Sequence, residues 1–383
     1  MKKKKIAVLF PAYDDAGWMG GVYYIRNIVN QFVAYARTCE EIDYQAYVLL
    51  SDKVRDVFSF EEEDEHIHLL TKKKYPWSEG AGFFNRNMRE IEMRARLICH
   101  GIDYIYPSFC ERGINRRKTI AWIPDFQHVV YPEFFSKDEC AFRDEYYGTI
   151  AAKHNKLVLS SNDAYDTYAQ LYPKYLDNVY VVPFASAIEK SMISGDVETV
   201  KAKYGLQNKD YFIVCNQFYR HKNHKLVFET MKKLVAEGHD DIAVVCTGLQ
   251  KDVKDPSFYP EIEQMLKESN LQENVHILGL IERKDQLLLM KESIAVVQPS
   301  YFEGWGTCTE DGKTLGKIVV LSDIPVHRQQ ADDRAIIVGK DDVDGLKNTM
   351  LSLWNEYKGK KKVEGYNISA AVEYGKMFAE MLR

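Results

Sequence analysis

One turn gathers the residues of this chain that are best suited to hold a polyhydroxylated ligand. It begins at Pro299, directly after an apolar run, and carries three acids and two glycines: Glu303, Glu310, Asp311, Gly304 and Gly306. Glycines allow a tight turn with exposed backbone N–H groups. Carboxylates accept hydrogen bonds from hydroxyl groups, so acids on both sides of the turn could grip two parts of one ligand. Capping of the next helix would explain Glu310 and Asp311, but neither Glu303 nor the glycines.

A second segment offers positive charge in a comparable place. Residues 216–223 read Asn-Gln-Phe-Tyr-Arg-His-Lys-Asn and follow the apolar run Tyr211–Cys215. The segment sets Arg220 and Lys222 at the carboxyl end of a predicted strand. Cations in such a place neutralise the charge that grows on a departing diphosphate. A basic surface turn explains the same residues equally well.

A pair of glycines, Gly20 and Gly21, precedes the first predicted helix. Glycines there let backbone N–H groups approach an anionic or hydroxylated ligand. The spacing is not G-x-G-x-x-G, so the dinucleotide-binding fingerprint is absent, which counts against a hydride-transferring dehydrogenase. A plain tight turn explains the pair about as well.

These loops need strands to position them, and short apolar runs recur through the first half of the chain. Five runs are expected to be buried strands: Ile6–Phe10, Tyr44–Leu50, Ile102–Tyr106, Thr119–Ile123 and Lys156–Ser160. Longer helical patterns separate them, such as Val22–Arg37 and Arg86–His100. The alternation predicts a parallel sheet with helices on both faces.

The same rhythm restarts in the second half. Strands are expected at Tyr211–Cys215, Ile242–Thr247, Val275–Leu278, Ala295–Gln298 and Ile318–Leu321. Helices are expected at Asn223–Glu237, Pro260–Ser269 and Lys284–Ser293, and around Gly312–Leu315. The predicted fold class is therefore α/β, with two doubly wound parallel sheets whose carboxyl edges bind ligands in a cleft.

The length of 383 residues also favours two domains. The join falls near Val181-Val-Pro-Phe184, which predicts an N-terminal domain over residues 1–184 and a C-terminal domain over residues 185–367. The last segment, residues 368–383, is predicted to be an amphipathic helix.

Composition narrows the classes of partner. Hydrophobic residues make up 46% and charged residues 28%, with a net charge of -5, so nothing points to nucleic acid. Seven cysteines without CxxC spacing indicate reduced thiols, and no apolar run is long enough to span a bilayer. We therefore expect a cytoplasmic protein. The Lys2–Lys5 run predicts a solvated lead into the first strand or, more sharply, a peripheral contact with anionic lipid at the inner membrane face.

The motifs together resemble the donor site of one enzyme superfamily. They are Pro299-Ser-Tyr-Phe-Glu-Gly-Trp-Gly306, Glu310-Asp311, Leu315-Gly-Lys317 and Ser322-Asp-Ile-Pro325. The pattern is similar to that of retaining glycosyltransferases of the glycogen-synthase-like, mannosyltransferase-like superfamily, glycosyltransferase group 1. The similarity also includes Gly20-Gly21, Asp125-Phe-Gln-His128, Tyr131-Pro-Glu-Phe-Phe135, Ser160-Ser161, Val181-Val-Pro-Phe184 and His221-Lys-Asn223. It implies the GT-B fold, in which two Rossmann-like domains face a cleft and the last helix returns to the N-terminal domain.

The resemblance also implies roles for individual residues. Lys222 would bind the diphosphate of a nucleotide-sugar donor, Glu303 would contact hydroxyls of the transferred sugar, and Ile281 would lie at the edge of the base. Gly20 and Gly21 would face the phosphates from the other domain. The remaining donor-site positions are Asn216, Gly304, Trp305, Gly306, Thr307, Glu310 and Asp311.

Three departures from the family pattern bear on these roles. The second acid of the family's paired-glutamate motif falls on Asp311, so either Asp311 or the adjacent Glu310 would hold the ribose. The usual arginine is replaced by Gln217, and Arg220 could supply the charge from another angle. Pro124 precedes Asp125, at a position where many relatives have histidine. Asp125 or His128 would then line the acceptor side, although a packed histidine explains His128 nearly as well.

The implied reaction moves a hexose of the mannose or glucose type from a GDP- or UDP-linked donor to a glycan or lipid-linked acceptor, as in polysaccharide biosynthesis. Configuration would be retained through front-face attack, without cofactor or metal. Asp342-Val-Asp344 has the spacing of a metal motif but is predicted to cap a helix. Two alternatives remain at this stage: a nucleotide-sugar epimerase or hydrolase on the same fold, and a catalytically weakened nucleotide-sugar-binding protein.

Overall fold

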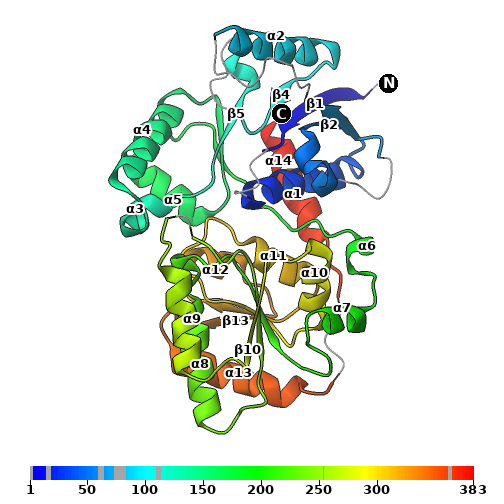
Figure 1. Ribbon diagram of the computed structural model, residues 1–383. Coiled ribbons are helices and arrows are strands. Elements are labelled where there is room, and N and C mark those ends of the chain that lie inside the picture. The colour runs from blue at the N-terminus through cyan, green and yellow to red at the C-terminus, as the bar shows by residue number, and fades with distance from the viewer. Residues whose placement is uncertain are drawn as a thin grey trace. The chain divides into compact units, whose positions relative to one another are not determined.

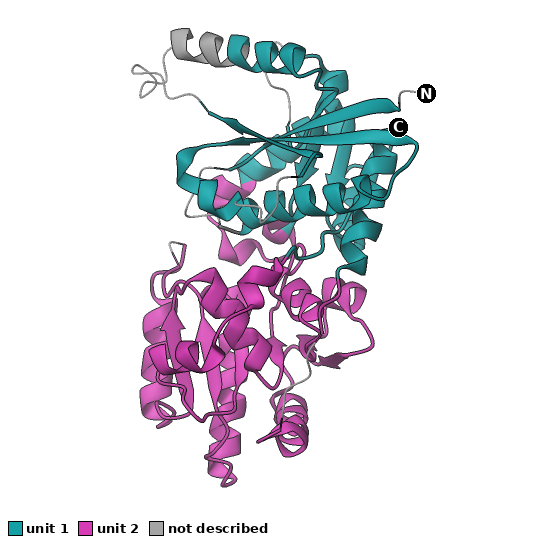
Figure 2. Cartoon of the chain, turned by 90° about the vertical axis from the view of Figure 1, so that its right-hand side faces the viewer, with its two compact units in different colours: residues 1–126, 141–187, 368–383 teal, residues 127–140, 188–367 magenta. Residues whose placement is uncertain are grey.

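The computed structural model describes residues 3–13, 19–58, 64–72, 83–108, 114–252, 254–360 and 365–383. Lys2, Cys110 and most of the loop before Gly20 lie outside these ranges. The chain divides into two compact units (Figure 2). Unit 1 comprises residues 1–126, 141–187 and 368–383, and unit 2 comprises residues 127–140 and 188–367. The division thus falls close to the predicted join, but it places residues 127–140 with the second unit rather than the first.

Unit 1 contains two parallel sheets. The first has the order β3-β2-β1-β4, formed by Ile67–Thr71, Ile42–Leu50, Lys4–Pro11 and Tyr104–Ile105. The second has the order β5-β6-β7, formed by Ile120–Ile123, Lys156–Leu159 and Val179–Val181. A single parallel bridge between Ile105 and Thr119 lies where the two sheets meet. The five predicted strands are confirmed, whereas β3 and β7 were not predicted.

Helices and short turns connect these strands. The helices are α1 (Met19–Ala36), α2 (Phe83–Cys99), α3 (Gln127–Val130), α4 (Lys137–Lys153) and α5 (Asn162–Leu171), with 3-10 turns η1 (Asp52–Phe58), η2 (Arg116–Lys118) and η3 (Pro132–Phe134). Of these, α3, η3 and the first residues of α4 lie in the segment 127–140 that belongs to unit 2. Apolar side chains of β1 and β2, including Ala7, Leu9 and Leu49, form one core with Leu97 of α2. Burial of such strands on both faces explains their continuous apolar runs.

The end of the chain packs against its beginning. Helix α14 (Ser369–Met381) lies along α1, the two drawn in red and blue in Figure 1. Gly375 permits this close approach, because a Cβ atom at this position would lie 1.9 Å from the carbonyl oxygen of Gln31. The Tyr104 hydroxyl donates to the carbonyl of Leu382, which fixes the end of the helix.

Unit 2 is built on one six-stranded parallel sheet with the order β10-β9-β8-β11-β12-β13. Its strands are β8 (Phe212–Cys215), β9 (Val244–Thr247), β10 (Val275–Gly279), β11 (Val296–Gln298), β12 (Val319–Ser322) and β13 (Ala335–Val338). The chain runs outward from β8 in one direction and from β11 in the other. The two central strands therefore form a topological switch point, where α/β sheets bind ligands.

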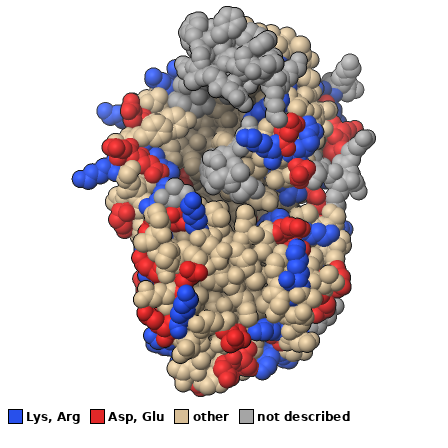
Figure 3. Space-filling model, in the orientation of Figure 1, with Lys and Arg blue, Asp and Glu red and all other residues tan. Residues whose placement is uncertain are grey.

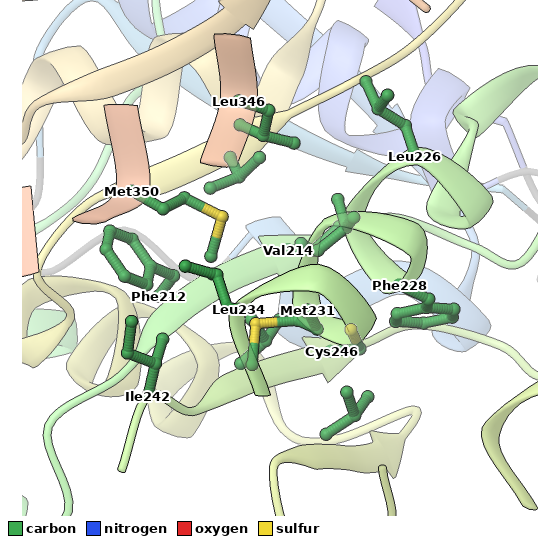
Figure 4. Close-up of a cluster of buried hydrophobic side chains, with 14 of the residues drawn as sticks. Phe212, Val214, Leu226, Phe228, Met231, Leu234, Ile242, Cys246, Leu346 and Met350 are labelled. Carbon is green, nitrogen blue, oxygen red and sulfur yellow. The ribbon is translucent and has the colours of Figure 1, made fainter. Parts of the chain in front are cut away.

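The helices of unit 2 cover both faces of this sheet. They are α6 (Lys190–Ile193), α7 (Val197–Lys203), α8 (His224–Ala236), α9 (Phe258–Glu268), α10 (Arg283–Glu292), α11 (Thr307–Thr314), α12 (Pro325–Gln330) and α13 (Val343–Tyr357), with the turn η4 (Arg220–Lys222). Figure 4 shows one core, in which Phe212 and Val214 of β8 pack with side chains of α8 and α13. A second cluster joins Ile213 and Val245 to α10, so alternate residues of each strand are buried on opposite faces.

The charged and apolar residues of the described structure are distributed as the amino-acid composition predicts. Acidic and basic side chains are interspersed on the face shown in Figure 3. Among the described helices, none is both long and apolar enough to cross a bilayer. Asp342 caps α13 by accepting a hydrogen bond from the Gly345 N–H at 2.8 Å, which confirms the predicted capping role.

Candidate functional site

Two loops leave the sheet of unit 2 side by side at its switch point. Residues 216–223 follow β8 and residues 299–306 follow β11, and these two strands are neighbours. The Tyr301 N–H donates to the His221 carbonyl at 2.8 Å, and the Asn223 side-chain amide donates to the Pro299 carbonyl at 3.1 Å. Asn223 has a left-handed backbone with φ of 53°, which asparagine tolerates better than most residues. These hydrogen bonds therefore hold the two loops in fixed positions relative to each other.

The fixed positions of these two loops bring Lys222 and Glu303 together. The Lys222 Nζ donates to Oε1 of Glu303 at 2.7 Å and to Oε2 at 2.8 Å. The two side chains are 18% and 7% exposed, so the pair is largely shielded from water. The sequence singled out both residues, and the structure places a cation and an acid in contact at the carboxyl edge of the sheet.

Glu303 is held by neutral donors as well as by the lysine. The Ser300 hydroxyl donates to its Oε1 at 2.7 Å, and the Gln298 side-chain amide donates to the same oxygen at 2.8 Å. Burial by itself raises the pKa of Glu303, but the charge of Lys222 and the hydrogen bonds from its Nζ lower it to about 2. Glu303 is therefore an ionised hydrogen-bond acceptor at neutral pH.

Asn216 and Gln298 form a reciprocal amide pair beneath this acid. The Asn216 Nδ2 donates to the Gln298 Oε1 at 2.9 Å, and the Gln298 Nε2 donates to the Asn216 Oδ1 at 3.1 Å. Both residues are buried, so these bonds satisfy groups that water does not reach. The predicted donor-site residue Asn216 thus uses its side chain to support Gln298.

Arg220 faces a different set of acids. Its guanidinium donates to Asp255 at 2.6 Å and to Glu261 at 3.1 Å, and it lies over the Phe258 ring at 4.9 Å. The structure therefore anchors Arg220 to the start of α9 and the loop before it. The predicted partnership of Arg220 with Lys222 at one diphosphate would require these bonds to be exchanged.

The glycine turn has a different backbone role from the one expected. The Gly306 N–H donates to the Gln330 Oε1 at 3.1 Å, and the Gln330 Nε2 donates to the Gly306 carbonyl at 3.1 Å. The N–H of Gly306 is thus committed to a buried side chain of α12, which corrects the expectation that it is exposed. A Cβ atom at Gly306 would lie 3.0 Å from the Thr309 Oγ1 and 3.1 Å from the Gln330 Oε1, so close packing favours glycine there. Gly304 and Trp305 precede this point, and Thr307 begins α11.

The two acids after the turn are both buried. Glu310 accepts hydrogen bonds from Gln330 at 2.9 Å and from the Lys313 Nζ at 3.1 Å, and burial raises its pKa. Asp311 pairs with the Arg283 guanidinium at 2.5 Å. In this arrangement neither carboxylate is presented to solvent, since each residue is only 1% exposed.

The comparisons with known proteins cover the part of the chain that holds these residues. Residues 196–368 match the family of glycosyl transferases group 1. That stretch contains the Lys222–Glu303 pair and most of unit 2. Residues 196–368 therefore belong to the glycosyl transferases group 1. The family inferred from the sequence motifs is thereby confirmed for this part of the chain.

Curated relatives and solved structures extend the comparison. The O-antigen chain mannosyltransferase RfbU of Salmonella typhimurium is 24% identical over 229 residues, which are 59% of this chain and 58% of that protein. The alignment thus spans less than two thirds of that relative. The Anabaena protein HepE, solved with UDP and glucose, is 12% identical with a TM-score of 0.61, over 98% of this chain and 95% of that chain. Sucrose-phosphate synthase from Thermosynechococcus elongatus is 13% identical with a TM-score of 0.62, over 98% of this chain and 94% of that chain. The predicted GT-B fold is confirmed.

Three further residues of the group 1 motifs lie in less expected places. Gly20 and Gly21 fall inside the first turn of α1, which begins at Met19, rather than before it. Gly20 is exposed and Gly21 is buried. Ile281 follows β10 and is partly buried against the core cluster that contains Leu287. The prediction that it borders the base stays a prediction.

Asp125 and His128 belong to different units of the chain. Asp125 lies in unit 1, where its carboxylate is 3.7 Å from the Arg143 guanidinium. His128 lies in α3 and is 3% exposed. Its ring packs edge to face on that of Phe135, with 6.3 Å between the two ring centres. Its burial favours the packed histidine over a residue that lines the acceptor side.

The segment of residues 127–140 packs on the loops of unit 2. The Lys254 Nζ pairs with Glu139 at 2.7 Å and lies 4.0 Å from the centre of the Phe135 ring. The Tyr131 hydroxyl donates to the carbonyl of Tyr301 at 3.4 Å, and its ring contacts Phe302 edge to face. These contacts explain why the segment groups with unit 2, which the sequence position alone did not indicate.

Sequence reasoning missed four residues of the site: Gln298, Ser300, Arg283 and Gln330. Gln298 carried a signal, because it is the polar residue that ends an apolar strand. Arg283 and Gln330 carried none, since their contacts with Asp311 and Gly306 depend on how α10 and α12 pack.

Proposed function

We propose that this chain transfers a sugar from a nucleoside-diphosphate sugar to a hydroxyl group of an acceptor. The Lys222–Glu303 pair carries the proposal, because it stands at the switch point of the sheet within the group 1 stretch. A cation beside an ionised acid suits a ligand in which a diphosphate adjoins a polyhydroxylated ring.

In the proposed reaction the bond between the anomeric carbon and the diphosphate oxygen breaks. Lys222 stabilises the negative charge that develops on this oxygen, and Glu303 accepts a hydrogen bond from a hydroxyl of the sugar. The acceptor oxygen attacks from the same face, so configuration is retained. Its proton passes to the leaving diphosphate, so positioning replaces a dedicated base.

The finer specificity rests on the relatives. The Salmonella relative is named as an O-antigen chain mannosyltransferase, which supports a mannose-type sugar and a polysaccharide acceptor, and the ligands of HepE support a UDP-linked glucose-type donor. We propose a hexose of one of these types and a glycan or lipid-linked acceptor. The reaction is proposed to need no metal or cofactor, at the cytoplasmic face of the membrane or in the cytoplasm.

The first test is a thermal-shift panel with UDP, GDP, UDP-glucose and GDP-mannose. A ligand at about 100 times its Kd stabilises the folded protein by about 2.7 kcal/mol, which raises the melting temperature measurably. We expect one diphosphate and its sugar to raise it and the other pair to leave it unchanged. No shift with any of the four ligands would contradict the proposed donor class.

The second test measures transfer from the donor so identified to a panel of glycans and lipid-linked sugars. Lys222→Ala and Glu303→Ala are each expected to lower transfer at least tenfold, since one lost charge-stabilising contact costs about 2–4 kcal/mol of barrier. Lys232→Ala removes an exposed lysine of α8 and serves as the control. Near-normal turnover in either site variant would overturn the site, and donor binding without turnover would favour a binding protein.

A further inference from the structure

The two oxygens of the Glu303 carboxylate are bound unequally. Oε1 accepts from three donors: Lys222 at 2.7 Å, Gln298 at 2.8 Å and Ser300 at 2.7 Å. Oε2 accepts from Lys222 alone among the hydrogen bonds of the described residues, at 2.8 Å. A carboxylate oxygen has two lone pairs, so Oε1 is saturated and Oε2 retains capacity for one more donor.

The orientation of Gln298 follows from its neighbours. An ionised carboxylate only accepts hydrogen bonds, so the Nε2 of Gln298, rather than its oxygen, must face Glu303. The Oε1 of Gln298 then accepts from the Nδ2 of Asn216, and the Oδ1 of Asn216 accepts from the Nε2 of Gln298. Gln298 is 1% exposed and Asn216 is 5% exposed, so neither amide can exchange these partners for water.

Ser300 completes this support from the loop itself. Its hydroxyl donates to Glu303, and its carbonyl accepts from the Ser322 hydroxyl at 2.5 Å. Glu303 is thus tied to β8 through Asn216, to β11 through Gln298 and to β12 through Ser322. Three adjacent strands of the sheet fix one carboxylate.

We propose that Gln298, assisted by Ser300, is the positioning residue that saturates Oε1 of Glu303 and leaves Oε2 to accept a hydrogen bond from a hydroxyl of the donor sugar. This inference rests on the proposed function. Gln298 does not touch the substrate. It acts by holding the carboxylate in one rotamer with one oxygen available.

The substitution Gln298→Glu provides a test with a signature of its own. It replaces the amide donor by a second carboxylate of the same shape, directly beside Glu303. Two such carboxylates share a proton, and the pair titrates at a raised pKa. When the pair holds that proton, the introduced acid can donate to Glu303 as the amide did; when the proton is lost, the two acids repel each other.

Binding is to be measured by isothermal titration from about pH 5 to about pH 8, across the range in which a shared proton is lost. The probes are whichever of UDP with UDP-glucose, or GDP with GDP-mannose, shifts the melting temperature. For the wild type, the Kd of the nucleotide sugar should be nearly constant, because Glu303 is ionised throughout and the diphosphate of the sugar carries no proton that is lost in this range. The terminal phosphate of the free diphosphate does lose a proton near about pH 6, so each Kd of a variant is compared with that of the wild type for the same ligand at the same pH. For Gln298→Glu, the Kd of the nucleotide sugar should rise at least tenfold with pH relative to the wild type. The Kd of the diphosphate should differ less than threefold from that of the wild type at the same pH.

Two further variants keep the test decisive if Gln298→Glu folds poorly. Gln298→Met keeps the volume but donates nothing, so it should weaken nucleotide-sugar binding at every pH without acid rescue. Ser300→Ala removes one of the three donors to Oε1 and should have a smaller effect of the same kind, roughly threefold to tenfold. Circular dichroism and melting temperatures identify variants that have lost the fold.

The outcomes separate this inference from the proposed function. If Glu303→Gln weakens nucleotide-sugar binding but Gln298→Glu follows the wild-type pH profile, the positioning role is wrong and the site stands. If Glu303→Gln changes neither Kd, the proposed function of the site fails first. Parallel loss of diphosphate and nucleotide-sugar binding in Gln298→Glu would also overturn the inference, since it indicates general damage.

Discussion

Glu303 and Glu310 stand on either side of the same glycine turn, and each is buried beside a lysine. Their pKa values nevertheless move in opposite directions. The pKa of Glu303 falls to about 2, whereas burial raises the pKa of Glu310. The charge of Lys222 makes the difference, because its Nζ lies 2.7 and 2.8 Å from the two oxygens of Glu303, whereas the Lys313 Nζ reaches one oxygen of Glu310 at 3.1 Å.

Glu310 has weaker compensation for the same burial. Gln330 donates at 2.9 Å and Lys313 at 3.1 Å, both to Oε1. Desolvation penalises the charged form of any buried acid, and a close opposite charge or donated hydrogen bonds can reverse that penalty. The comparison indicates that the first acid stays ionised, as its proposed binding role requires, whereas the second ties the start of α11 to α12.

The largest effect is expected from removing the cation beside Glu303. Lys222→Met leaves the Glu303 carboxylate buried without its opposite charge, which costs about 3–5 kcal/mol of unfolding free energy. The double variant Lys222→Met with Glu303→Gln should recover at least about 2 kcal/mol of that loss, because no unpaired charge remains. Urea denaturation of the four proteins measures this coupling. Additive costs would show that the two side chains do not interact as the structure has them.

The second-largest effect is expected in the pH dependence of the unfolding free energy, to which Glu303 contributes. Its pKa is lowered in the folded protein from 4.5 to about 2, so its stabilisation is present above about pH 4.5 and is lost as the pH falls toward about 2. The shift corresponds to about 3 kcal/mol. The stability difference between the wild type and Glu303→Gln should shrink by about this amount over that window, as measured by urea denaturation at each pH. A difference that does not vary with pH would contradict the lowered pKa.

Among the described strands, every inner strand was predicted from the sequence, but only three of the six edge strands were, namely β4, β5 and β10. The buried runs of β1, β2, β8, β9 and β11 were predicted because strands covered on both faces are continuously apolar. The missed strands β3, β7 and β13 each lie at an edge of their sheet. Residues of β3 and β7 are mostly half-buried, with His68 and Thr71 in β3, so their pattern resembles that of a loop.

The site residues also divide into those that local sequence predicts and those whose contacts depend on tertiary packing. Lys222 and Glu303 were predicted because each follows a buried strand, and the loops after neighbouring parallel strands meet at one edge. The pairing of Asp311 with Arg283 was not predicted, since it requires α10 and α11 to lie side by side. The commitment of the Gly306 N–H to Gln330 likewise depends on the packing of α12.

The smallest effect, and the sharpest test of the comparison, is expected for Glu310→Gln. The pKa of Glu310 is raised in the folded protein, so its contribution to stability is fully present below the unfolded pKa and is lost as the pH rises through the folded pKa. Glutamine keeps the carbonyl that accepts from Gln330 and removes the buried charge, but it leaves the partly exposed Lys313 ammonium without its acid. Because these two effects oppose each other, the variant should stay within about 1 kcal/mol of the wild type at neutral pH.

The slope with pH distinguishes the two acids. The advantage of the wild type over Glu310→Gln should fall as the pH rises, whereas its advantage over Glu303→Gln should grow over the acid window. Glu263→Gln, which removes an exposed charge from α9, gives the baseline for both series. If Glu310→Gln instead loses stability with the same pH dependence as Glu303→Gln, then the donors around the two acids are equivalent. The division between a binding acid and an anchoring acid would then have to be abandoned.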